Sequence, residues 1–129
     1  MPSLSKLVGM GAPPAGAQFM VGDVAAGLIA TGATQGTALA MSANFAQFTT
    51  VAAGTGAILP AVAAVPMLGV SNGDSIEVFN LGANALAVYP PVGSTINSLA
   101  ANTSLAVPAG KGARFIQLSP TNWGAILSA

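Results

Sequence analysis

Side chains that could do acid–base or metal chemistry are nearly absent from this sequence of 129 residues. It contains neither histidine nor cysteine, and only 5% of its residues are charged, against roughly 25% in an ordinary soluble domain. The sequence therefore offers little for catalysis, metal capture or thiol chemistry, and we expect no enzyme activity, no cofactor and no metal site. The charged residues are Lys6, Asp23, Asp74, Glu77, Lys111 and Arg114.

Asp74 and Glu77 are the two acidic residues closest to each other that could form a catalytic carboxylate pair, as glycoside hydrolysis requires. Their odd separation places them on opposite faces of an extended segment. Asp74 also follows Asn72-Gly73 directly, and this dipeptide is typical of a tight hairpin turn. The spacing therefore favours a structural role for both carboxylates.

The triplet Gly110-Lys111-Gly112 invites comparison with a phosphate-binding loop. Such a loop needs a glycine five positions before Gly110, where Leu105 stands, and a serine or threonine after the lysine, where Gly112 stands. A Ser-His-Asp triad is excluded because there is no histidine, and a Ser-Lys pair would need a desolvated lysine beside a hydroxyl that no pattern identifies. Hydrolase chemistry is not supported.

Two surface motifs remain to be weighed. Asn102-Thr103-Ser104 matches the glycosylation sequon, but no secretory signal accompanies it, so a plain loop is the preferred interpretation. Tyr89 and Trp123 could provide stacking faces in a carbohydrate-binding module, which is an alternative function from a different class. Isolated aromatic residues in strands are, however, more typical of a protein core.

The charge pattern argues against nucleic acid and membrane as partners. The formal net charge is zero, and no basic cluster of the kind that binds phosphate backbones is present. Residues 51–70 are long and apolar enough to raise the possibility of a membrane span, but they contain Pro60 and Pro66, and each interior proline costs a helix about 3 kcal/mol. A small membrane protein stays as an alternative that detergent partitioning and circular dichroism would test.

The chain divides into an arm and one domain. Residues 1–22 show no sustained periodicity and contain Pro2, Pro13 and Pro14, so an extended N-terminal arm is expected there, covered by a partner or disordered. Residues 23–129 are expected to form the folded domain, since a chain of this length supports one core.

Short runs of β-formers recur every 8 to 12 residues in the domain, separated by Gly, Asn, Pro or Ser, and this pattern predicts an all-β fold. We expect a compact antiparallel sandwich or barrel of jelly-roll type. A hairpin is expected at Asn72-Gly73. Strands are predicted at residues 37–42, 46–51, 75–80, 85–89, 104–107, 113–119 and 123–127, with weaker signals at 28–31, 67–70 and 95–97.

The last two predicted strands are apolar on both faces. Within residues 113–118 one face carries Ala113, Phe115 and Gln117, and the other carries Arg114, Ile116 and Leu118. A sandwich that stands alone would show one polar face. Either another subunit covers the outer face, or the surface is rich in alanine and only scores as hydrophobic. The first interpretation is favoured and predicts a closed homo-oligomer.

Ordered sequence blocks resemble a module that recurs in small structural proteins of tailed bacteriophages. The resemblance covers residues 28–127 and carries no catalytic motif, so no site residue is transferred; the arm lies outside it. The blocks are ATGATQ at 30–35, TTVAAGTGAILP at 49–60, GDSIEVFN at 73–80, GANALAVYPPVGSTIN at 82–97, and the ending from VPAG at 107–110 through Phe115 to TNW at 121–123.

The resemblance implies a virion structural protein. The first hypothesis is a capsid decoration or cement protein, a homo-oligomer for which a trimer is favoured, with the major capsid protein as partner. It would reside on the capsid surface of the virion, after passing through the host cytoplasm during assembly. A phage fibre or tail-associated oligomer that contacts the host is the alternative within the same class.

Overall fold

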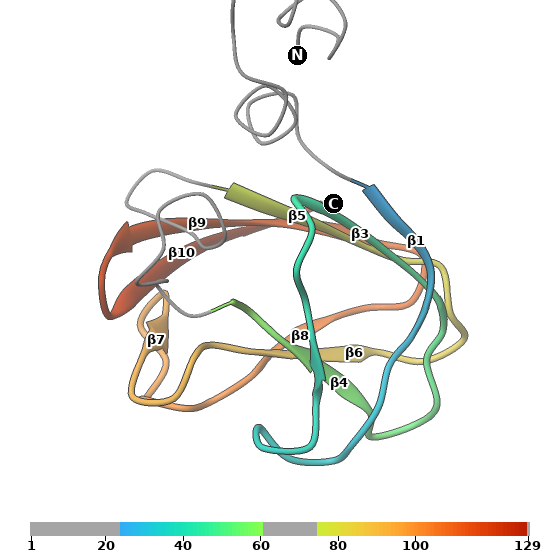
Figure 1. Cartoon of the computed structure of the whole chain (residues 1–129), viewed down its shortest axis with the longest axis horizontal. Coiled ribbons are helices and arrows are strands. Elements are labelled where there is room, and N and C mark those ends of the chain that lie inside the picture. Colours follow the sequence, from blue (N-terminus) through green and yellow to red (C-terminus); the bar gives the residue numbers. More distant parts are fainter. Residues whose placement is uncertain (1–23, 61–74, 129) are drawn as a thin grey trace, which may run out of the picture.

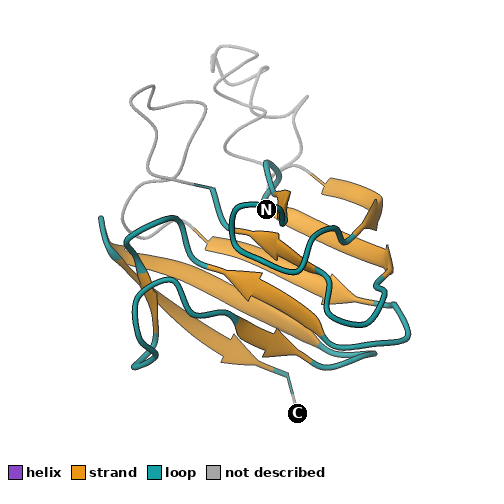
Figure 2. Ribbon diagram, turned by 90° about the horizontal axis from the view of Figure 1, so that it is seen from below, coloured by secondary structure: helices purple, strands orange, loops and turns teal. Residues whose placement is uncertain are grey.

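The computed structural model describes residues 24–60 and 75–128, which form strands and loops without a helix (Figures 1 and 2). The strands are β1 (Val24–Ile29), β2 (Leu39–Ala40), β3 (Phe45–Thr50), β4 (Gly56–Ile58), β5 (Ser75–Asn80), β6 (Leu86–Tyr89), β7 (Thr95–Ile96), β8 (Leu105–Val107), β9 (Gly112–Ser119) and β10 (Asn122–Leu127).

The strands form two sheets that face each other across a common core (Figure 1). The larger sheet has the order β1-β3-β5-β9-β10-β7, and the smaller has the order β2-β4-β6-β8. One cluster of buried apolar side chains joins them: Phe48, Val78 and Phe115 come from the larger sheet, and Leu86 and Val88 from the smaller one. The core therefore lies between the two sheets, and each sheet turns its other face outward.

The expected antiparallel arrangement is wrong, because both sheets are mixed. From β1 to β9 the chain visits the two sheets alternately. Each passage through the opposite sheet brings the chain back to the same end, so β1, β3 and β5 run parallel to one another, as do β2, β4 and β6. A strand of the other sheet thus serves as the crossover that parallel pairing requires, a role usually filled by a helix. Among the strands of residues 24–60 and 75–128, the antiparallel pairs are β5–β9, β9–β10 and β6–β8, and an isolated antiparallel bridge joins Thr31 to Gly56.

Most predicted strands that fall within the described residues are confirmed. The bounds of β5 match the predicted bounds, those of β6, β8, β9 and β10 differ by one residue at the start, and β3 is shifted by one residue at both ends. Of the weaker signals, 95–97 corresponds to β7, whereas 28–31 overlaps β1 only at residues 28 and 29. The run at 37–42 is shorter than expected, with only Leu39–Ala40 in a strand, and β4 was missed. The arm at 1–22, the Asn72-Gly73 hairpin and the strand at 67–70 lie outside the described residues.

Asn80, at the end of β5, is a fully buried polar residue whose amide is completely used. Its Nδ2 donates to the carbonyl oxygens of Asn84 at 2.8 Å and Val107 at 2.9 Å, and its Oδ1 accepts from the backbone N–H of Gly82 at 3.0 Å. The first and third bonds shape the turn after β5, and the second reaches β8 in the other sheet. One side chain therefore ties the two sheets together at this end.

Gln117 and Trp123 are buried polar residues of the opposite kind. They are register partners on β9 and β10, both have no exposed surface, and neither the Gln117 amide nor the Trp123 indole N–H has a hydrogen-bond partner. A buried polar group without a partner costs about 1–3 kcal/mol. The pair therefore lowers the stability of the core locally, in contrast to buried Asn80, whose amide has partners.

Replacing Gln117 with methionine is expected to raise the free energy of unfolding by about 1–2 kcal/mol, because methionine keeps the length of the side chain and removes the unpaired amide. Urea unfolding monitored by Trp123 fluorescence would measure this change in the free energy of unfolding. Gln117→Glu is the matched control, and it should destabilise by burying a charge. A loss of stability in Gln117→Met would show that the amide has a partner in solution, such as an internal water molecule.

Candidate functional site

The outward side of the six-stranded sheet carries an aligned row of side chains from five strands. Strand register places Val24 beside Phe45, Phe45 beside Glu77, Glu77 beside Arg114, and Arg114 beside Ile126. Residues paired in this way point to the same side of a sheet. The row therefore presents one acid and one base at its centre with apolar side chains on both flanks.

Large apolar side chains surround this row. Phe79 on β5 is 41% exposed, Leu118 on β9 is 58% exposed and Ile126 on β10 is 64% exposed. Leu118 lies over Gly124, where the missing side chain leaves room for it. We call the surface formed by Val24, Phe45, Glu77, Phe79, Arg114, Ile116, Leu118 and Ile126 the outer face. Gln47 and Ser75 lie on the same side as the register partners of Phe79 and Ile116, so polar groups interrupt it. Its apolar residues are large, and alanine does not account for its apolar character.

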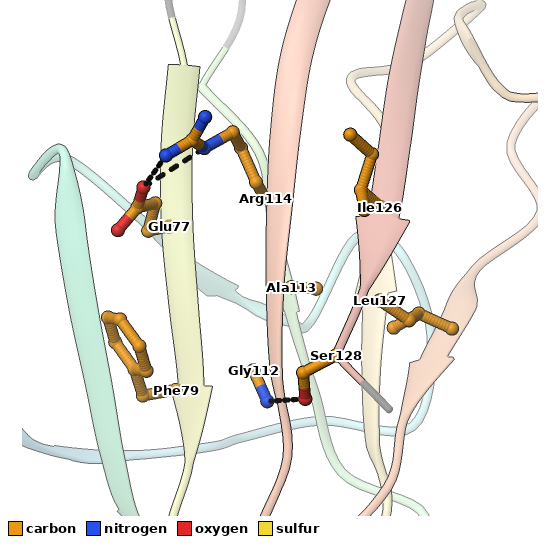
Figure 3. Close-up of a pocket in the computed structure, with 8 residues that line it drawn as sticks. All are labelled: Glu77, Phe79, Gly112, Ala113, Arg114, Ile126, Leu127 and Ser128. Atoms are coloured by element: carbon orange, nitrogen blue, oxygen red, sulfur yellow. Dashed lines mark hydrogen bonds and ion pairs between the residues drawn. The ribbon is translucent and has the colours of Figure 1, made fainter.

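The ion pair at the centre of the outer face is asymmetric. Arg114 donates from Nε at 3.0 Å and from Nη2 at 2.6 Å, and both bonds end on Oε1 of Glu77 (Figure 3). The Arg114 side chain is 55% exposed and that of Glu77 22%. A solvated pair of this kind contributes about 0–1 kcal/mol to stability. The ion pair matters more for binding specificity than for stability, because a partner surface that docks here must match both charges.

A shallow depression of about 270 Å³ lies beside the ion pair, between Phe79 and Ile126 (Figure 3). Gly112 forms part of its wall, and the Ser128 hydroxyl there accepts a hydrogen bond from the Gly112 N–H at 3.0 Å. The depression combines apolar walls with one ion pair and contains no nucleophile activated by a base. Its lining suits an apolar side chain better than a reacting substrate. The lining residues are Glu77, Phe79, Gly112, Ala113, Arg114, Ile126, Leu127 and Ser128.

The structure describes two of the charged candidates for chemistry, Glu77 and Lys111. Glu77 pairs with Arg114 on the outer face, and Asp74 lies outside the described residues. Lys111 stands in the turn between β8 and β9, where its backbone N–H donates to the Pro108 carbonyl at 3.1 Å and Gly110 has a φ of 76°. Gly110-Lys111-Gly112 is therefore part of a tight turn that leads into a strand.

The two aromatic residues considered for sugar stacking lie in different sheets. Trp123 on β10 is completely buried and presents no face to a ligand. Tyr89 on β6 is half-buried, and its hydroxyl donates to the Ala33 carbonyl at 3.2 Å. The structure therefore forms no stacking platform from this pair.

Asn102, the first residue of the sequon, has a loop-forming role. It adopts a positive φ of 65°, and its Oδ1 accepts from the Gly93 N–H at 2.6 Å and from Gln35 Nε2 at 3.2 Å. Asparagine tolerates this left-handed conformation better than most residues. Together with Asn80, it shows that asparagine amides hold the loops of this weakly charged chain, which the sequence interpretation missed.

Within residues 24–60 and 75–128, no group of three or more acidic side chains is placed to hold a metal ion. In the same ranges there is no helix with the length and hydropathy that a bilayer span needs.

Comparison of the chain with protein-family models, with curated proteins and with solved structures finds no match. The functional argument therefore depends on the residues of the outer face and on the resemblance of the sequence blocks.

Proposed function

We propose that this chain is a bacteriophage virion structural protein, most specifically a capsid decoration or cement protein that binds the assembled head. The observation that carries the assembly part of the proposal is the outer face, where large apolar side chains stand exposed around an ion pair. Contiguous apolar surface of this kind marks an interaction site. The block resemblance over residues 28–127 points to a virion as the setting.

The arrangement of the two sheets supports this proposal. Two facing sheets with a shared core favour the sandwich form of the expected fold over the barrel, and they leave the outer face of the larger sheet for contact with other subunits. A protein that functions by repeated contacts needs surface that fits a partner rather than reactive groups. The proposed partner is the major capsid protein, and the proposed form is a homo-oligomer, with three copies favoured.

The mechanism is stabilisation by linkage. A protein that binds the assembled shell, and does not bind free capsid subunits, shifts the equilibrium toward the shell with no change in covalent bonds. Each occupied site then contributes about 2.7 kcal/mol when the free protein is present at 100 times its Kd. The site of action is the capsid surface.

Heads that lack this protein should release their DNA at a lower temperature than complete heads. Thermal release can be followed with a DNA-binding dye in heads of the phage that encodes the chain, with and without its gene, and adding back the purified chain should restore the release temperature. Unchanged release would contradict the decoration role. Separating heads from tails before mass spectrometry tests the fibre alternative, because that alternative places the chain in the tail fraction.

A further inference from the structure

The two charged side chains at the centre of the outer face each have a polar atom that their ion pair does not engage. Both hydrogen bonds from Arg114 end on Oε1 of Glu77, so this ion pair does not engage Oε2 of Glu77 or Nη1 of Arg114. Figure 3 shows the Glu77 and Arg114 side chains turned toward each other, with Phe79 beside Glu77 on β5 and Ile126 on β10. A surface that docks here must therefore place a base near Glu77 and an acid near Arg114, with apolar groups around them.

The outer face itself meets this requirement. When a second copy is rotated against the first, its Arg114 can lie opposite Glu77, and its Glu77 opposite Arg114, while the apolar flanks meet each other. A strongly acidic or basic partner would match only one of the two charges and would leave the other desolvated and unpaired. The chain has a net charge of zero, so no general repulsion separates the copies.

The size of the outer face fits a weak, reversible subunit contact, because a standard stable interface buries about 800 Å² on each partner. Five strands spaced about 4.8 Å apart and about six residues long define a footprint of roughly 400 Å². The largest apolar patches on monomers have about this size and are often functional. The depression beside the ion pair adds a hollow of about 270 Å³ that could receive an apolar side chain of the facing copy.

We propose that the outer face is covered by the outer face of a second copy of this chain, with Glu77 of each copy opposite Arg114 of the other. A contact in which a surface meets its own copy closes a two-fold dimer, so this inference replaces the three copies that the resemblance favours with two. This inference rests on the proposed function for the view that the face is buried in an assembly, and it names the partner. Since the outer face is then internal to the oligomer, the capsid would be bound through other surfaces.

Charge exchange at the two positions tests the proposal. Glu77→Arg gives a face with two bases, and Arg114→Glu gives a face with two acids. Each variant alone should associate at least tenfold more weakly than the natural chain, because like charges then meet. An equimolar mixture of the two variants should regain the oligomer, since a basic face now meets an acidic one. The double variant, which restores one acid and one base in exchanged positions, is the matched control and should associate like the natural chain.

Sedimentation velocity over a range of concentrations gives the masses, and circular dichroism reports whether each variant folds. A natural chain that is monomeric at 100 times the concentration needed for detection, or folded single variants that keep the full oligomer mass, would overturn the inference. So would folded single variants that fail to associate when mixed. If a single variant does not fold, Ile126→Lys provides a second test, because it places a charge among the apolar residues of the outer face. The oligomer of this variant is expected to dissociate, and an unchanged oligomer mass would overturn the inference.

Binding to heads, measured on the same samples, separates the two proposals. A monomer that binds heads would refute this inference and leave the proposed function standing. An oligomer that responds to the charge exchange and does not bind heads would refute the decoration role and leave the inference standing.

Discussion

Phe48→Ala is expected to lower the free energy of unfolding by about 3–5 kcal/mol, the largest loss that we predict for a single substitution. Phe48 lies in β3, between β1 and β5, and has no exposed surface. Removing its ring leaves a cavity between the two sheets, and the neighbouring strands can close only part of it. Chemical unfolding monitored by Trp123 fluorescence would give the value.

Phe79→Ala is the matched control, because Phe79 lies on the neighbouring strand and points to the opposite side of the same sheet. Its loss should be small in the monomer and should grow with protein concentration, since oligomer formation adds to apparent stability. Equal losses for the two variants at every concentration would contradict the assignment of an inner and an outer face.

Asn80→Ala should cost about 2–4 kcal/mol, although it removes a polar residue, because it leaves one buried and two partly buried backbone groups without their partner. The carbonyl oxygen of Val107 and the N–H of Gly82 lose their bonds to the amide, as does the carbonyl of Asn84. The expected signature is a lower denaturation midpoint together with faster hydrogen exchange at Gly82.

Asn84→Ala provides the comparison for Asn80. The exposed Asn84 side chain makes one bond, from Nδ2 to the Val51 carbonyl at 2.9 Å, so its loss should stay near 1 kcal/mol. If Asn80→Ala were no worse than Asn84→Ala, the account of Asn80 as a tie between the sheets would be refuted.

Local structure was predictable where the chain alternates or turns. The pleat of β5 follows directly from the sequence, since Ile76 and Val78 are buried and Glu77 lies between them on the other side. The two faces assigned to residues 113–118 are also confirmed, with Ala113, Phe115 and Gln117 buried. These features depend on neighbours in the sequence and on the period of two.

Pairing between strands was not predictable, because it depends on contacts between residues that are distant in sequence. Nothing in residues 45–50 indicates that they pair in parallel with β1 and β5, with each connection passing through the other sheet. Strand β4 was missed for a related reason. Glycine is a poor strand former, so residue 56 carries no strand signal. The reason for a glycine at this position lies on the paired strand, because a side chain at Gly56 would collide with the carbonyl oxygen of Ala87 on β6.

The candidate site was predictable in part. The sequence indicated that Arg114, Ile116 and Leu118 share one face of a strand, but for Glu77 it indicated only a structural role on the opposite face from Asp74. The pairing of Glu77 with Arg114 requires β5 and β9 to be adjacent and in a particular register. The signal that could have suggested it is the scarcity of charge, since opposite charges in a chain with so few are good candidates for a pair.

The most direct test of the proposed function is co-sedimentation of the purified chain with phage heads. The heads come from the phage that encodes the chain and are prepared without it. A parallel experiment replaces the heads with free capsid subunits. The account predicts saturable binding to assembled heads at a fixed ratio to the capsid protein, and no binding to free subunits. Failure to bind heads at any concentration, or equal binding to free subunits, would contradict it.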